Sequence, residues 1–191
     1  MRSASWLVGW LSVLTAVSAL GGGGHFLEPA DHNDCPERCR CDKETRTAVC
    51  TSIIGGLPPR LPPEFDSLTI QNATDFYVIP KHAFRKMDRL REIRFENCPH
   101  LQTIEKFAFK NLRNLRLLSF SGCPSLTELV KGAFSSIQNE ELLKIRITAP
   151  IRTVHGGAFR YFYFFLQNTA LSGVMKIDSH AFSNRYLLIF I

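Results

Sequence analysis

The 191-residue chain lacks the features that mark an enzyme or a metalloprotein. It contains no Gly-x-Ser-x-Gly element, no His-Glu-x-x-His pair and no phosphate-binding loop. None of its six histidines stands at metal-binding spacing. We therefore expect no catalytic residue, no metal and no cofactor, and we do not expect the chain to be an enzyme.

Long hydrophobic runs are scarce as well. The apolar run Trp6 to Leu20 has 15 residues, whereas about 20 are needed to span a bilayer. The run follows Met1-Arg2 and leads into small residues such as Ala19 and Gly21, which is the pattern of a cleaved secretory signal. Residues 1–21 are therefore predicted to be a signal peptide, and no membrane span is expected in this chain.

Charge of one sign is not concentrated anywhere. The chain carries 23 Lys and Arg against 17 Asp and Glu, and removing residues 1–21 takes away only Arg2. Basic and acidic residues are interspersed, as on an ordinary solvated surface. The mild excess of positive charge leaves sulfated glycans as an alternative partner, and no nucleic acid is expected.

A repeat organises the rest of the chain. The dipeptide Ala-Phe recurs at steps of 25, 25, 25 and 23 along the sequence: Ala83-Phe84, Ala108-Phe109, Ala133-Phe134, Ala158-Phe159 and Ala181-Phe182. Further apolar positions repeat with the same step, including Ile70, Phe95, Phe120 and Ile145. Repeats of this length are typical of leucine-rich-repeat proteins. The sequence therefore predicts a leucine-rich-repeat solenoid with about five repeats in residues 65–191.

The spacing within each repeat predicts the architecture. A short strand with period-two alternation pairs in parallel with the same strand of the next repeat, and the remaining residues return on the other side. The expected fold class is an α/β solenoid, a horseshoe with a parallel concave β-sheet. The fifth repeat is irregular: we expect Leu166 to take the place of Ile145, and a sixth strand to begin at Leu187.

The ends of the solenoid need covering, because no repeat can bury its own apolar edge. Residues 22–34 are glycine-rich and polar and are predicted to be a flexible N-terminus. Residues 35–64 are expected to form a cysteine-rich cap. No comparable cap is visible at the other end, and an open apolar edge is an aggregation hazard. Two interpretations remain: a truncated form of a longer protein, or an edge that a partner covers.

Six cysteines fall into two groups. Cys35, Cys39, Cys41 and Cys50 are clustered, and in a secreted chain disulfides are a better interpretation than zinc. Sequence alone allows three pairings. Cys98 and Cys123 stand one repeat apart, at a position where inward side chains are expected. Buried, inert thiols are the favoured interpretation, with a bond between the two as the alternative.

The candidate ligand-binding residues are strand positions that point out of the concave sheet. The repeats align Ser119 with Lys144, and Ser121 with Arg146, in a surface that grades from mixed charge to neutral, basic and aromatic. Arg and Tyr are common anchors in protein interfaces. The predicted set is Gln71, Glu92, Arg94, Glu96, Ser119, Lys144, Arg146 and Tyr163. Asn72-Ala73-Thr74 is a glycosylation sequon at the edge of this face.

The cap Cys35-Pro36-Glu37-Arg38-Cys39-Arg40-Cys41 and the repeat Ile79-Pro80-Lys81-His82-Ala83-Phe84 resemble those of extracellular leucine-rich-repeat proteins. Within them, the chain is most similar to the ectodomains of glycoprotein-hormone receptors. The resemblance implies the disulfides Cys35–Cys41 and Cys39–Cys50. It also implies a concave sheet that binds a secreted, cystine-knot hormone-like protein.

The resemblance places the chain outside the cell. We expect it to be secreted, or at the cell surface if a longer parent carries the seven-helix membrane domain of those receptors. Signalling through that domain is not carried over. The alternative function is that of a secreted matrix or guidance-type binding protein.

Overall fold

The structure is a computed structural model that describes residues 35–53, 58–138, 143–160, 166–171, 176–177 and 187–189. The chain divides into two units, Met1–Asp31 and His32–Ile191, and every described residue belongs to the second. The predicted signal peptide, the predicted flexible segment 22–34 and Tyr163 lie outside the described residues.

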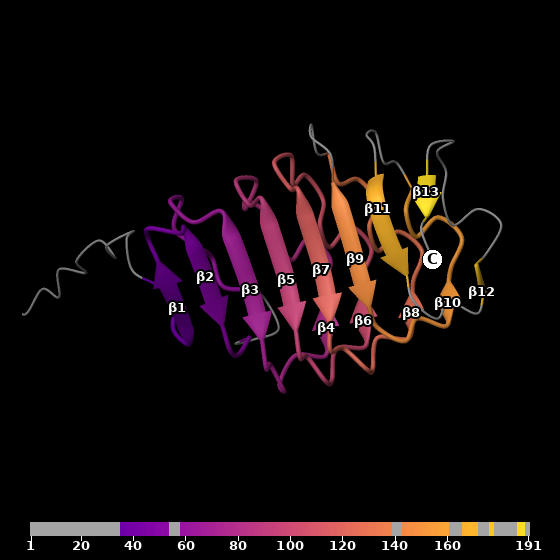
Figure 1. The fold of residues 1–191 in the computed structure, drawn as a ribbon, viewed down its shortest axis with the longest axis horizontal. Helices are drawn as coiled ribbons and strands as arrows, with labels where there is room; N and C mark the ends of the chain where they lie inside the picture. Colours follow the sequence, from indigo (N-terminus) through magenta and orange to yellow (C-terminus); the bar gives the residue numbers. More distant parts are fainter. Residues whose placement is uncertain are drawn as a thin grey trace, which may run out of the picture. The chain divides into compact units, whose positions relative to one another are not determined.

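One eight-stranded sheet dominates the second unit (Figure 1). Its order is β1-β2-β3-β5-β7-β9-β11-β13, and all neighbours pair in parallel except β1 with β2. The strands are β1 (Cys39–Asp42), β2 (Thr47–Cys50), β3 (Ser67–Gln71), β5 (Glu92–Glu96), β7 (Leu117–Ser121), β9 (Lys144–Thr148), β11 (Leu166–Leu171) and β13 (Leu187–Ile189). The strand expected at Leu187 is thus β13.

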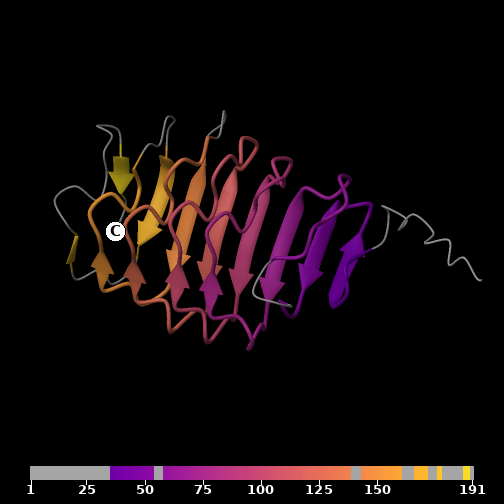
Figure 2. The ribbon, with the colours of Figure 1, turned by 180° about the vertical axis from the view of Figure 1, so that it is seen from behind.

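The return segments carry two-residue strands, visible from behind in Figure 2. These are β4 (Val78–Ile79), β6 (Thr103–Ile104), β8 (Glu128–Leu129), β10 (Thr153–Val154) and β12 (Lys176–Ile177). β4 pairs with β6, while β8, β10 and β12 form a three-stranded sheet. The parallel-strand solenoid is confirmed. In the part of the chain that the structure describes, the returns consist of turns and short strands, without a helix.

Phenylalanine fills the space between the sheet and the returns. The Ala-Phe phenylalanines stack from repeat to repeat, with ring centroids 5.2 Å apart for Phe84 and Phe109 and 4.9 Å for Phe134 and Phe159. The alanines let the backbones approach, since the Phe84 N–H donates to the Ala108 carbonyl at 3.4 Å. The dipeptide that marks the repeat in the sequence is therefore its packing unit in the fold.

The cysteine cluster covers the first edge of the sheet. β1 and β2 form an antiparallel hairpin, and β2 pairs in parallel with β3 as another repeat would. Disulfides join Cys35 to Cys41 and Cys39 to Cys50. Of the three pairings that the sequence allows, this is the one that the family resemblance implies. The main-chain groups of β3 that would face solvent are thereby paired.

The fourth repeat is displaced from the expected alignment. The structure pairs Lys144 with Leu117 and Arg146 with Ser119, whereas continuing the even spacing of the earlier repeats placed them beside Ser119 and Ser121. The step from β7 to β9 is therefore two residues longer than the step from β5 to β7, while the step between the return strands β8 and β10 is unchanged. A shift of two keeps every side chain on its expected face of the sheet. Ile147, not Ile145, is consequently the neighbour of Phe120.

The fifth repeat also differs from expectation. β11 pairs Ala170 with Arg146 and Leu171 with Ile147. The expected alignment, with Leu166 in the place of Ile145, is therefore wrong. The even spacing of the first three repeats does not extend past β7 in the main sheet, whereas the return strand β10 keeps it, since Thr153 pairs with Glu128 and Val154 with Leu129.

Cys98 and Cys123 are free and buried. The Cys98 thiol donates to the Ile70 carbonyl at 3.6 Å, and the Cys123 thiol to the Ser121 carbonyl at 3.5 Å. The hydrogen bond with Cys123, together with burial, raises the pKa of Cys98 far above its usual range. A thiol held in this way is a poor nucleophile, because the thiolate is the reactive form.

Candidate ligand-binding face

The side of the sheet opposite the phenylalanine core is its open face. Alternation along each strand places one residue in the core and the next on this face; on β5, for example, Ile93 and Phe95 are fully buried while their neighbours are not. Strand pairing then aligns the outward residues in three rows. They are Ser67-Glu92-Leu117-Lys144, Thr69-Arg94-Ser119-Arg146 and Gln71-Glu96-Ser121-Thr148.

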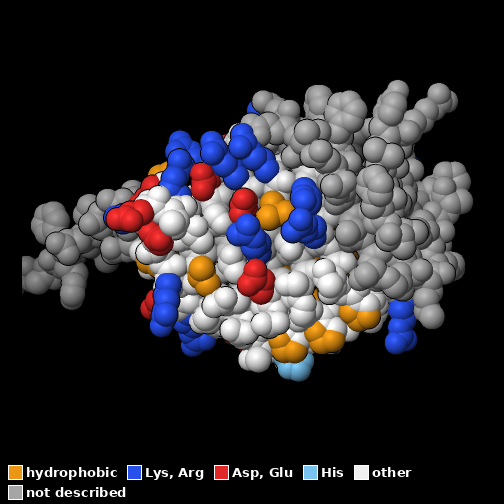
Figure 3. Space-filling model, in the orientation of Figure 1, with side chains coloured by type: hydrophobic (Ala, Val, Ile, Leu, Met, Phe, Trp, Pro, Cys, Tyr) orange, Lys and Arg blue, Asp and Glu red, His pale blue; other side chains and the backbone are white. Residues whose placement is uncertain are grey.

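Charge on the open face changes from strand to strand, as Figure 3 shows with acidic and basic side chains over β5 and basic ones over β9. On β5, the Arg94 guanidinium lies 2.6 Å from the Glu92 carboxylate, and both side chains are about a third exposed. β7 contributes small neutral hydroxyls and Leu117. On β9, Arg146 is exposed and Lys144 is half-buried.

The first repeat offers less surface than expected. Ser67 and Thr69 point to the open face but are each only 7% exposed, because they lie between β2 and the larger side chains of β5. Gln71 remains half-buried. On β3, only the carboxyl end is therefore accessible on the open face.

The eight predicted ligand-binding residues have different outcomes. The open face carries seven of them: Gln71, Glu92, Arg94, Glu96, Ser119, Lys144 and Arg146. Arg94, Ser119 and Arg146 share one row, so two guanidinium groups flank one serine. The eighth, Tyr163, lies outside the described residues.

Sequence reasoning missed three residues of this face. Thr148 is exposed at the end of β9, in the row of Glu96. Val49 of the cap pairs with Thr69, and Arg40 pairs with Val49, so the middle row continues onto the cap. The alternation of Thr47-Ala48-Val49-Cys50, which matches that of a repeat strand, was the available signal.

Asn72, the sequon residue, directly follows β3 and is exposed. Its backbone has a φ of 54°, a left-handed value that Asn tolerates better than most residues, and its N–H donates to the Glu96 carbonyl at 2.9 Å. The side chain thus stands at the rim of the open face, next to Gln71. Glycosylation there stays a prediction.

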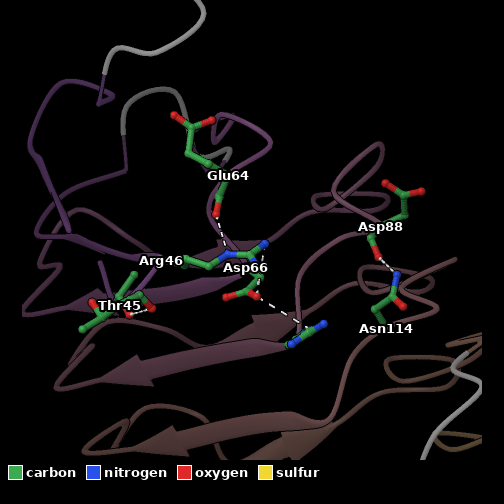
Figure 4. Close-up of polar contacts among 8 residues, drawn as sticks. Thr45, Arg46, Glu64, Asp66, Asp88 and Asn114 are labelled. Carbon is green, nitrogen blue, oxygen red and sulfur yellow. Dashed lines mark hydrogen bonds and ion pairs between the residues drawn. The ribbon is translucent and has the colours of Figure 1, made fainter. Parts of the chain in front are cut away.

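An ionic contact joins the cap to the repeats where the strands begin (Figure 4). Asp66 lies 3.4 Å from the Arg46 guanidinium and 3.7 Å from that of Arg91. Arg46 also donates to the Glu64 carbonyl at 2.8 Å. The two arginines are about half exposed, so the pairs contribute little stability.

Within the described ranges, no three His, Cys, Asp or Glu side chains are grouped as a metal site would require. Nor do these ranges hold a helix long and apolar enough to cross a membrane.

A parallel solenoid with a disulfide-bonded cap at its first edge is the architecture of a leucine-rich-repeat protein. BspA type leucine-rich repeat regions match residues 64–189 in six copies. The match covers more than half of the chain, and the chain belongs to this family. No curated protein matches it.

Among solved structures, the chain is similar to human 5T4, also called Wnt-activated inhibitory factor 1 and trophoblast glycoprotein. The two are 26% identical, with a TM-score of 0.50 over 60% of this chain. The match spans 42% of the 5T4 chain, so this chain corresponds to less than half of that protein.

Proposed function

We propose that the protein captures an extracellular protein ligand on the open face of its sheet, in the manner of a receptor ectodomain. Membership of the leucine-rich-repeat family and the likeness to 5T4 support a binding scaffold. The two disulfides support an oxidising, extracellular setting. The arrangement of charge on β5, β7 and β9 is the observation that carries the choice of face.

The ligand surface complementary to this face is acidic where it meets β9. Among the ion pairs of the described residues, none engages Lys144 or Arg146, so both cations are available to a partner's carboxylates. Ser119 and Ser121 beside them are small and offer hydroxyls, which lets a ligand backbone approach closely. Glu96 on β5 is the acceptor for a basic group of the same ligand.

The resemblance to glycoprotein-hormone receptors supports a cystine-knot hormone-like protein as the ligand. The second candidate is a matrix or guidance-type protein that binds its partner without a membrane domain. Both functions use the open face, and they differ in the partner that the face selects.

The test is charge reversal on β9. Lys144→Glu with Arg146→Glu changes the net charge by four units, and we expect it to weaken capture of a cystine-knot ligand at least tenfold, since two charge-assisted contacts are lost. Lys43→Glu with Arg152→Glu is the matched control, because both residues are exposed and lie outside the three rows. Biolayer interferometry with the secreted chain and a panel of secreted cystine-knot proteins measures the change.

Equal affinity of the β9 variant and the wild type for a captured ligand would remove the open face from consideration. Capture of extracellular-matrix proteins instead of the panel, still sensitive to the β9 reversal, would favour the second candidate. Circular dichroism of each variant separates a lost contact from a lost fold.

A further inference from the structure

Two adjoining hollows on the return side of the solenoid are lined by cations. Their volumes are about 290 and 300 Å³, and they share His82, Arg85 and Lys86. Lys110 and Asn111 line the first hollow, and Arg60 the second. Among the described residues, no Asp or Glu lines either one. The hollows are separate from the open face, because the core phenylalanines lie between sheet and returns.

The repeat itself brings these cations together. Arg85 and Lys110 hold the same position in neighbouring repeats, each directly after a buried phenylalanine of the stack. The bond from the Phe84 N–H to the Ala108 carbonyl holds the two return segments side by side. Lys86 and Asn111, next along each segment, have left-handed backbones with φ of 72° and 67°. The cationic side chains thus project from a turn that is repeated in the two neighbouring return segments.

Opposite charge is sparse around the hollows. Segments 80–89 and 105–113 carry seven Lys and Arg against two carboxylates, Asp88 and Glu105. Glu105 is already engaged, since it accepts a hydrogen bond from the Lys81 N–H at 2.7 Å. The ion pairs among the described residues include neither Arg85 nor Lys110.

The pKa of His82 is affected by the positive charges around the hollows. Partial burial comes first, and the positive charges of Lys81, Lys110 and Arg85 add to it, so that the pKa of His82 lies below its usual value. Three cations therefore act on one imidazole that stands where the two hollows meet. An anion bound there would oppose their effect on the imidazolium.

We propose that these hollows bind the sulfate groups of a sulfated polysaccharide, with Arg85, Lys86 and Lys110 as the main contacts. Arginine and lysine are the usual partners of sulfate and phosphate oxygens. Lys81 and Lys106 add two more cations, since they occupy equivalent positions in the two neighbouring repeats, a few residues before Arg85 and Lys110. Neighbouring coils are spaced by roughly 5 Å, so the cations form a row suited to a linear polymer with regularly placed anions.

A sulfated polysaccharide fits better than the other polyanions. The disulfides indicate an oxidising compartment, where such glycans are abundant and nucleic acid is not. Unpaired bases would need a free aromatic ring on which to stack, and the Phe107 ring beside the hollows is already stacked on His82 and lies under the Lys106 ammonium group. Binding here goes beyond capture of a protein ligand and does not depend on it, because the open face and the hollows share no residue.

The experiment uses heparin as the probe and the secreted chain as the protein. We expect Arg85→Glu with Lys110→Glu to raise the dissociation constant for heparin at least tenfold at physiological salt, measured by surface plasmon resonance. Lys43→Glu with Arg152→Glu makes the same change in net charge away from the hollows, and less than a twofold change is expected. The milder Arg85→Gln with Lys110→Gln serves where charge reversal impairs folding, with a smaller loss expected.

Three further arms make the result specific. Desulfated heparin of equal length should bind weakly, and raised salt should weaken heparin binding by screening. Single-stranded DNA and phosphatidylserine vesicles should not match heparin. In an NMR titration, heparin should shift the His82 imidazole resonances and raise the pKa of His82, because the bound anion favours the imidazolium form.

The proposal is overturned by an equal loss in the control variant, which would show attraction by net charge alone. Full binding of the Arg85 and Lys110 variants overturns it as well, as do DNA or vesicles that bind as tightly as heparin. Heparin binding that survives the reversal on β9 but not the reversal in the hollows supports it, whatever the outcome for the protein ligand.

Discussion

The rings of Phe95 and Phe120 stack with centroids 4.7 Å apart and planes 7° from parallel. Both residues lie on strands of the main sheet, and each meets Phe109 of the return edge-on, at 6.4 and 6.3 Å. Phe109 in turn stacks on Phe84 and Phe134. The core is thus two stacks of aromatic rings, one from the strands and one from the returns, in the offset and edge-to-face arrangements that aromatic rings prefer.

Replacing Phe109 by alanine should test how far the stacks hold the repeats together. The ring contacts four others and is fully buried, so we expect a loss of about 3–5 kcal/mol in the free energy of unfolding. Urea denaturation followed by circular dichroism measures it. Tyr77→Ala is the control: Tyr77 is 52% exposed, and its removal should cost about 1 kcal/mol or less. Equal losses would show that the stacks add nothing beyond surface contacts.

Gly122 should tolerate no side chain. It has a φ of +63°, and a Cβ there would clash with the Asn97 side chain and lie 3.1 Å from its backbone. Gly157 has a similar φ of +76°, but its nearest neighbours are 3.8 Å from a Cβ. Gly157→Ala should therefore cost about 1 kcal/mol for backbone strain alone, and Gly122→Ala clearly more. Thermal denaturation of both variants decides, and a Gly122→Ala loss no larger than that of Gly157→Ala would contradict the steric argument.

Much of the solenoid could be predicted from the period of the sequence. Ala-Phe recurs because Ala108 and its equivalents accept backbone bonds from the neighbouring repeat while the phenylalanines stack. Each repeat needs the same close backbone contact and the same stacked ring, so the Ala-Phe pair recurs along the chain and is visible in a single sequence. The outward positions on β5 and β7 follow by alternation.

The sequence predicted the pairing of Val154 with Leu129 on the return side, but not the register of the main-sheet strands past β7. Two residues inserted before β9 leave the apolar alternation intact, so Ile145 and Ile147 are equally good candidates for the place beside Phe120, and only pairing decides. Nor did it reveal the hollows beside His82. Their cations come from different repeats and look like dispersed surface charge until the returns are stacked.

Asp75 should make stability fall in acid. Its carboxylate accepts hydrogen bonds from the Ser52 hydroxyl and, at 3.5 Å, the Ile53 N–H, which ties the first repeat to the end of the cap. The Ser52 bond lowers the pKa of Asp75 below its usual value. A carboxyl whose pKa is lower when folded stabilises the fold above its unfolded pKa, near 4, and loses this effect as pH falls through the folded pKa.

Asp75→Asn should therefore lower Tm at neutral pH, with a difference from wild type that shrinks to nothing in strong acid. Scanning calorimetry between about pH 7 and pH 2 follows the two curves. Asp88→Asn is the matched control, since the Asp88 side chain makes no ion pair among the described residues. A constant Tm difference across the range would mean that Asp75 acts by shape and not by charge.

The buried thiols should resist modification. The hydrogen bond between the two thiols raises the pKa of Cys98 and lowers that of Cys123, but both side chains are buried, so iodoacetamide at about pH 8 should leave the native chain unlabelled. Denaturation without reductant should then yield two labels per chain, counted by mass spectrometry. Labelling of the native chain would place at least one thiol at the surface. No labels after denaturation would show that the two cysteines are joined.

The two cap disulfides should differ in importance. Cys39–Cys50 joins paired residues of β1 and β2 and has a sequence separation of 11. Cys35–Cys41 has a separation of six and does not link β1 to β2. Chain entropy alone favours the longer loop by only about 0.5 kcal/mol. We nevertheless expect Cys39→Ser with Cys50→Ser to lower Tm markedly more than Cys35→Ser with Cys41→Ser. Without the Cys39–Cys50 disulfide, no covalent bond holds β1 against β2, and the edge of β3 is covered only by β2. Equal losses of Tm in the two double variants would mean that the disulfides stabilise the cap through chain entropy and not by holding β2 over the edge of β3.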